Sequence, residues 1–143
     1  QDVPRLNPDL MGQVNVRNVS GGKKTNPLWV SNVSNQGLRG ALEQSLTAVG
    51  YRSQNRTAAK YQVDAFLDDL DQPAFGLTYV VKSSVSYTVN ADGVNTPFPI
   101  MATGTATTSD AFIGTERMRI ANERSIKESI KKFIQQISAY YSK

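Results

Sequence analysis

Neither cysteine nor histidine occurs in this sequence, and each absence removes a class of chemistry. Zinc sites built from thiolate and imidazole ligands are excluded. Nucleophilic catalysis by a cysteine–histidine or serine–histidine pair is excluded as well. Disulfide bonds cannot form, although this says little about compartment, because a periplasmic domain can fold without one.

Long apolar runs are also missing, since no stretch approaches the roughly 20 residues that a membrane-spanning helix needs. Hydrophobic residues make up 39% and charged residues 20% of the 143 residues, which is typical of one globular domain. The net charge of +4 is mildly basic and does not by itself indicate a nucleic-acid partner. We expect Gln1–Leu10, which has no apolar period, to form a flexible N-terminal tail, and residues 11–143 to form a single domain.

The first half of the chain indicates a strand followed by a helix. In "QVNVRNV", Gln13–Val19, two valines share one face, as in a strand. The stretch "SNQGLRGALEQSLTAVGY" has an apolar stripe at helical spacing, and Ser34 or Asn35 can cap its start. Between them, the loop "SGGKKTNP" leads to a short β-prone piece at Leu28–Val33.

The next part of the chain predicts three strands. "YQVDAFLDDL" is a predicted strand from Tyr61 to about Leu70. From Leu77 to Val89, every odd position except one serine is apolar, so one face of this strand should be buried. Asp-Gly at 92–93 predicts a hairpin turn, and the return strand should run from about Thr96 to Thr108.

From Glu116 onward the apolar period becomes that of a helix. The apolar stripe consists of Ile126, Ile130, Phe133, Ile134, Ile137 and Tyr141. The spacing predicts ion pairs of Glu123 with Lys127 and of Glu128 with Lys132, one helical turn apart. Because acids interleave with bases, we interpret the charge as the solvated face of a helix and expect no nucleic-acid partner.

Acidic residues are the remaining candidates for catalysis or metal binding, because acid–base chemistry without histidine falls to Asp, Glu, Lys or Tyr. Asp68, Asp69 and Asp71 form the best carboxylate cluster, but their spacing is not that of a calcium loop. A solvated strand end is the favoured interpretation. Asp64 stands inside a strand with no obvious partner. The sequence therefore predicts no catalytic residue, no metal site and no cofactor.

These elements predict an α+β fold. Both the C-terminal helix and the strand at 77–89 have an apolar side that needs cover. We expect a two-layer sandwich, in which an antiparallel sheet of about four strands carries two helices packed on one face. The other face of the sheet is left to water or to a partner.

A candidate interaction edge lies on the last predicted strand. Pro97 and Pro99 cannot donate to a ladder, so the start of this strand should lie at the edge of the sheet or outside the ladder. An exposed edge or face can bind a partner by strand addition or by side-chain contact. The candidate interaction residues are Met101, Thr103, Thr105, Thr107 and Phe112.

Four stretches together resemble small bacterial cell-envelope lipoproteins of the periplasm and outer membrane, a family of unassigned role. These are "VSNVSNQGLRGALEQSLTAVGY", "YQVDAFLDDLDQPAFG", "VSYTV" and "RMRIANERSIKESIKKFI". The order of elements is also similar to periplasmic helper domains of lipopolysaccharide assembly and to transport-auxiliary lipoproteins. The resemblance implies a periplasmic domain that is tethered to the outer membrane through an acylated cysteine, a residue that this chain does not contain.

The leading functional hypothesis is a non-enzymatic periplasmic domain of an envelope lipoprotein. We expect it to bind another envelope protein or to associate with itself. Contact with a membrane is expected only through a lipid anchor outside this chain. The alternative is an enzyme, such as a transferase that acts on an envelope precursor, which would need a concave pocket with convergent polar groups.

Overall fold

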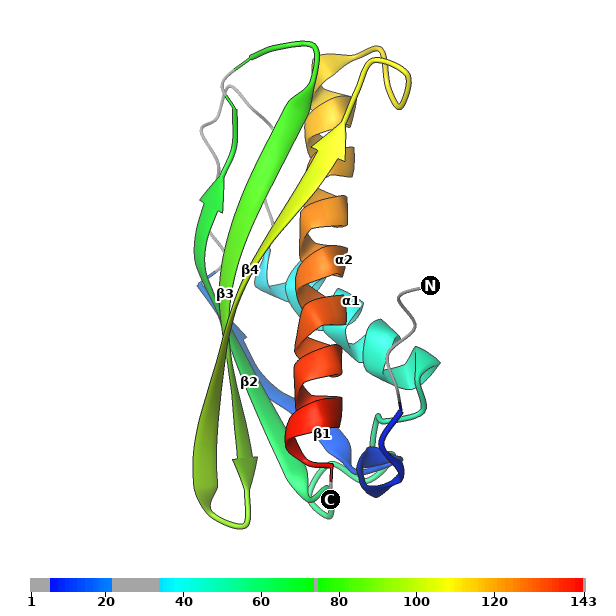
Figure 1. Ribbon diagram of the computed structural model, residues 1–143, viewed down its shortest axis with the longest axis vertical. Coiled ribbons are helices and arrows are strands. Elements are labelled where there is room, and N and C mark those ends of the chain that lie inside the picture. Colours follow the sequence, from blue (N-terminus) through cyan, green and yellow to red (C-terminus); the bar gives the residue numbers. More distant parts are fainter. Residues whose placement is uncertain (1–5, 22–33, 74, 143) are drawn as a thin grey trace.

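The computed structural model describes residues 6–21, 34–73 and 75–142 (Figure 1). In this part of the chain a strand, a helix, three strands and a second helix follow one another in the predicted order, after a short 3-10 helix. The elements are η1 Pro8–Leu10, β1 Val14–Ser20, α1 Asn35–Ala48, β2 Tyr61–Asp71, β3 Tyr79–Ala91, β4 Val94–Ala106 and α2 Gly114–Tyr140. The predicted β-prone piece at Leu28–Val33 lies outside the described residues.

The strands form a four-stranded sheet in the order β1-β2-β3-β4. β2, β3 and β4 are antiparallel neighbours, as predicted, whereas β1 runs parallel to β2, with Val14 opposite Tyr61. The prediction of a wholly antiparallel sheet is therefore wrong at β1. The reason is the connection: α1 returns the chain to the end where β1 began, so β2 runs in the same direction as β1. The sheet is mixed, and the predicted α+β class is confirmed.

A tight hairpin joins β3 to β4. Asp92 and Gly93 form its turn with positive φ values of 54° and 78°, the conformation that matches a two-residue turn to twisted strands. β4 is an edge strand of the sheet. This position confirms the expectation drawn from Pro97 and Pro99.

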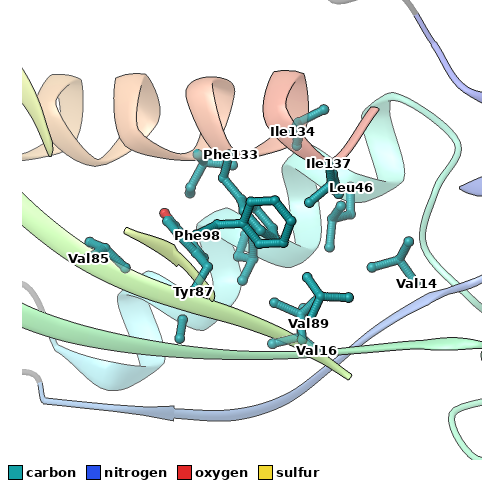
Figure 2. Packing of buried hydrophobic residues seen from close by; sticks show 14 of the residues in the cluster. Val14, Val16, Leu46, Val85, Tyr87, Val89, Phe98, Phe133, Ile134 and Ile137 are labelled. Carbon is teal, nitrogen blue, oxygen red and sulfur yellow. The ribbon is translucent and has the colours of Figure 1, made fainter. Parts of the chain in front are cut away.

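Both helices share one hydrophobic core with the inward side chains of all four strands. The apolar stripe of α2 is buried as predicted, since Ile130 and Ile137 are 1% and 2% exposed. At the centre of this core, Tyr87 of β3 stacks on Phe133 of α2, with ring centroids 4.1 Å apart and planes 10° from parallel (Figure 2). Burial of a large apolar side chain stabilises a fold by about 1.5–3 kcal/mol, so this cluster is the main source of stability.

Buried serines connect α2 to the sheet. Ser83, the one polar residue in the apolar alternation of β3, is fully buried. Its hydroxyl oxygen lies 2.8 Å from the Ser125 hydroxyl, which is also 3.2 Å from the carbonyl of Ala102. A turn later on α2, the Ser129 hydroxyl lies 2.9 Å from that of Tyr87. Because each hydroxyl has a partner, the polar groups are buried without a large desolvation cost.

Gly104 lets α2 lie directly against β4. A Cβ atom at this position would overlap the helix backbone at Ser125 and Ala121. Small side chains on both elements thus bring the two backbones close together. This close approach fixes where α2 sits along the sheet.

The folded domain begins earlier than predicted. Residues 7–10 were assigned to the tail, but Leu10 is fully buried and Asn7 is 5% exposed. The amide of Asn7 donates to the Tyr51 hydroxyl at 2.8 Å, and its side-chain nitrogen donates to the carbonyl of Ser138 at 3.2 Å. Sequence patterns do not predict this packing, because the segment contacts the core through single residues and has no apolar period.

We expect Gly104→Ala to lower the free energy of unfolding by about 1–3 kcal/mol, because the new methyl group overpacks the contact between β4 and α2. Urea unfolding followed by circular dichroism measures the change. The matched control is Gly40→Ala on α1, where a Cβ atom meets nothing within 4 Å. This control should leave stability unchanged or raise it by up to about 1 kcal/mol through helix propensity. Equal stabilities of Gly104→Ala and the parent protein would contradict the close approach.

Candidate interaction surface

The outward edge of β4 is largely closed to strand addition. Pro97 and Pro99 lack an amide hydrogen. Along β4 they stand at the same alternate positions as Met101 and Thr105, where the backbone groups point away from the sheet. The Met101 carbonyl accepts from Lys132 Nζ at 3.0 Å, and the Thr105 carbonyl accepts from Arg124 Nη1 at 2.8 Å. An incoming strand would have to displace both side chains and would still find no donor at the prolines. Such devices protect natural sheet edges from pairing with other chains.

The edge at β1 is closed by the chain itself. Val14 donates its amide to the Tyr51 carbonyl at 2.9 Å and accepts from the Ser53 amide at 2.8 Å. Two residues further on, the Val16 carbonyl accepts from Arg39 Nη1 of α1 at 3.2 Å. Side-chain contact is therefore the better-supported of the two binding modes considered for this sheet.

Asp64 has a partner that the sequence did not reveal. Arg17 on β1 donates from Nε to Oδ1 at 3.0 Å and from Nη2 to Oδ2 at 2.9 Å, and the Asn18 amide also donates to Oδ1. The hydrogen bond from Arg17 is the main reason why the pKa of Asp64 lies below its usual value. The parallel pairing of β1 with β2 brings these residues together. Asp64 is an ion-paired residue of the exposed face of the sheet, an environment that does not suit a general base.

The acidic cluster at the end of β2 lies along an exposed strand. Asp68 accepts a hydrogen bond from the Ser86 hydroxyl of β3. Asp69 and Asp71 are paired with β3 in the same ladder. Within residues 6–21, 34–73 and 75–142, no group of three His, Cys, Asp or Glu side chains is placed to hold a metal ion.

The charges of α2 pair differently from the prediction. The expected pairs of Glu123 with Lys127 and of Glu128 with Lys132 are wrong. Glu123 instead accepts at 2.7 Å from Arg119, which stands four residues earlier on the helix and reaches it with a planar, forked donor group. Lys132 reaches the carbonyl edge of β4, because α2 lies so close to that strand. Acids and bases remain interleaved on the exposed side of the helix.

Four large apolar side chains stand in solvent at one end of the molecule. They are Phe75, Leu77, Phe112 and Ile113, with exposed fractions of 81%, 74%, 89% and 65%. The first two belong to the connection between β2 and β3 and the last two to the segment between β4 and α2, which meet where α2 begins (Figure 1). We call these four residues the apolar tip. Clustered exposed apolar groups of this kind often mark interaction sites.

Arg117 holds the two segments of the apolar tip together. Its Nη2 donates to the Gly76 carbonyl at 3.0 Å, while Nη1 donates to the carbonyls of Phe112 at 2.8 Å and Ala111 at 3.2 Å. The guanidinium also lies over the Tyr79 ring, 4.9 Å from its centroid. Only 6% of Arg117 is exposed. This buried cation therefore clamps the tip from beneath and fixes its backbone.

A second contact orders the loop that carries half of the tip. Asp110 accepts from Arg124 at two oxygens, each at 2.9 Å, and from the Thr107 amide at 2.9 Å. The Arg124 hydrogen bonds are the main cause that lowers the pKa of Asp110 to about 2. The loop before α2 is therefore fastened at both of its ends.

The predicted interaction residues divide between two places. Met101, Thr103 and Thr105 lie on β4, and their side chains are exposed. Thr107 and Phe112 belong to the loop that follows. The structure groups Phe112 with the apolar tip, and it leaves Met101, 71% exposed, on the open face of the sheet.

Phe75, Leu77 and Ile113 are absent from the predicted interaction residues. The prediction that places Leu77 on the buried face of the strand at 77–89 is wrong, because β3 begins at Tyr79 and Leu77 is 74% exposed. A sequence signal for these residues lies in two motifs, "AFGL" and "AFIG", where large apolar residues stand beside a glycine at the end of a strand or the start of a helix. An apolar pair in a loop therefore indicated either a local contact or an exposed site.

Comparisons with known proteins show the fold alone. No protein-family model and no curated protein matches the chain. A crystal structure of a putative lipoprotein from Caulobacter crescentus CB15 has a TM-score of 0.64 at 12% identity, over 92% of each chain. The hypothetical protein CT253 from Chlamydia trachomatis has a TM-score of 0.54 at 12% identity, over 90% of this chain and 96% of that one. Among the helices described here, none is both long enough and apolar enough to cross a membrane.

We expect Arg117→Met to loosen the apolar tip, because three carbonyls lose their donor. Amide hydrogen exchange at residues 75–77 and 111–113 should accelerate, and the free energy of unfolding should fall by about 1–3 kcal/mol. The control is Arg52→Met, which removes an exposed ion pair to Glu43 and should change stability by less than about 1 kcal/mol. Unchanged exchange at the tip in Arg117→Met would refute the clamp.

Arg124→Gln should raise the pKa of Asp110 from about 2 toward the ordinary value of about 4. Because the folded-state pKa is depressed, the contact stabilises the protein above pH of about 4 and is lost as the pH falls toward 2. Carboxyl carbon NMR of Asp110 across this range measures the shift. Lys82→Gln, on the far side of the sheet, serves as the control and should not move it.

Proposed function

We propose that this chain is a non-enzymatic domain of the cell envelope that binds another protein through its apolar tip. The observation that carries the proposal is the exposure of Phe75, Leu77, Phe112 and Ile113 on two segments that one buried arginine clamps together. Exposed aromatic and aliphatic side chains on a rigid backbone lose little conformational entropy on binding. They are the usual anchors of a protein interface.

The charges near the tip favour a protein partner over a membrane surface. Arg124 is paired with Asp110, and Arg119 is shared between Glu116 and Glu123. Binding to anionic lipid draws on unpaired cations beside the inserted apolar groups. A paired, polar rim around an apolar centre is instead the arrangement of protein–protein interfaces.

The fold supports an envelope location. One similar structure is described as a putative lipoprotein, and the sequence stretches quoted above resemble envelope lipoproteins. We propose that the protein acts in the periplasm, tethered to the outer membrane. Asn7 packs beside Ser138 near the end of α2, whereas the tip lies where α2 begins (Figure 1). A 27-residue helix is about 40 Å long, so the apolar tip lies roughly that far from Asn7.

Little in the structure favours the alternative of a transferase. Its best candidate base, Asp64, is held by Arg17, and the acids at the end of β2 are spread along an exposed strand. Three grooves of the described part are lined by other residues.

The proposal predicts that Phe112→Ser combined with Leu77→Ser abolishes partner binding without unfolding the domain. The partner is first identified by a photo-crosslinking amino acid at position 112 in cells of the source organism, followed by mass spectrometry of the adduct. Binding of the purified partner is then measured by calorimetry. Loss of two exposed anchors should weaken binding by about a hundredfold or more.

The matched control is Met101→Ser, which removes a side chain of similar exposure on the open face of the sheet. It should bind as the parent does. If Met101→Ser weakens binding and the tip variant does not, the sheet face is the interface and the tip proposal fails. Sedimentation of the domain with vesicles that contain phosphatidylglycerol, lost in the tip variant, would assign the tip to a membrane instead.

A further inference from the structure

A groove between the two helices has the size of a small-molecule site. It has a volume of about 490 Å³ and lies between α1 and the N-terminal half of α2. Gly37 and Gly40 line one side, and a Cβ atom at Gly40 would meet nothing within 4 Å. The absence of side chains at these positions keeps the groove open. Ile126 of α2 adds an apolar surface.

Asn122 lines this groove with a donor that has no acceptor. The side chain is only 3% exposed, and its Oδ1 accepts from Gln72 Nε2 at 2.9 Å. This bond fixes which way the amide points. The Nδ2 group is buried and, among the described residues, lacks a hydrogen-bond partner. Buried amide groups in folded proteins are normally satisfied, so an orphan beside a groove indicates a ligand that accepts the bond.

The remaining charges of the groove favour an anion. Lys127 lines it and forms no ion pair with any described residue. The N-terminus of α1 faces the same groove through Ser34 and Gln36, and its first turn holds no acidic residue. The Ser34 hydroxyl caps the Gly37 amide at 2.9 Å, and no negative charge in this turn offsets the positive end of the helix dipole. Glu123 is paired with Arg119 at 2.7 Å, an arginine that also pairs with Glu116, so Lys127 is the cation of the lining that forms no ion pair with a described residue.

We propose that the groove between α1 and α2 binds a carboxylate ligand. One carboxylate oxygen accepts the hydrogen bond from Asn122 Nδ2, and Lys127 with the N-terminus of α1 balances the negative charge. The carboxylate belongs either to a small organic acid or to the C-terminus of a peptide. The site is separate from the apolar tip, so it stands or falls independently of the proposed function.

NMR titration of the ¹⁵N-labelled domain tests this site. Four probes are compared at millimolar concentration: succinate, trialanine, trialanine with an amidated C-terminus, and inorganic phosphate. Saturable shifts of the backbone amides of Gly37 and Gly40 and of the Asn122 side-chain amide are expected with succinate or trialanine. A response to trialanine that its amide lacks assigns a peptide C-terminus, and a response to succinate alone assigns a small acid.

Variants identify the groups that hold the ligand. Asn122→Leu should weaken binding about tenfold, and Lys127→Gln about threefold, while Lys82→Gln on the open face of the sheet should bind as the parent does. Lys127 is exposed, so its variant tests the site even if Asn122→Leu unfolds. The proposal is overturned if neither succinate nor trialanine produces saturable shifts. It is also overturned if phosphate binds as tightly as they do, or if Lys127→Gln keeps full affinity.

Discussion

The direct contact of α2 with β4 at Gly104 is the constraint on which the rest of the molecule depends. With no side chain in between, the helix backbone at Ser125 lies against the strand, and the helix cannot shift along the sheet without a clash. That position pairs the buried serines, stacks Phe133 on the sheet, and lets Lys132 reach the carbonyl edge of β4. Gly104 thereby determines both how the core packs and how the outer edge of β4 is covered.

The fixed backbone of the apolar tip also depends on the contact between α2 and β4. Arg117 stands in the first turn of α2, so the placement of the helix decides where its guanidinium meets the carbonyls of Gly76 and Phe112. The apolar tip lies at the start of this helix and the groove beside Asn122 is lined by its residues 119–127, so one element can present two separate surfaces.

Local patterns in the sequence predicted the helices, most strand positions and the hairpin, because alternation and helical periods reflect which face of an element is buried. Local patterns could not predict the contacts between segments that are distant in the sequence. The parallel placement of β1, and with it the pairing of Arg17 with Asp64, depends on how α1 returns the chain. Ser83 is a polar residue within an apolar alternation because its hydroxyl is hydrogen-bonded to Ser125 of α2, a residue distant in the sequence. Of the apolar tip, only Phe112 is among the predicted interaction residues, whereas Leu77 continues the alternation of β3 and is therefore predicted to be buried although it lies before the strand.

The closed edges of the sheet limit how this protein can assemble. Since β1 is bridged at Val14 by its own chain and β4 offers prolines and occupied carbonyls, much of each edge is closed to a further strand. Growth into open-ended fibrils by edge-to-edge stacking is thereby disfavoured. Copies that met through the apolar tip would use the same patch on each partner, and such an arrangement closes on itself at a symmetric dimer.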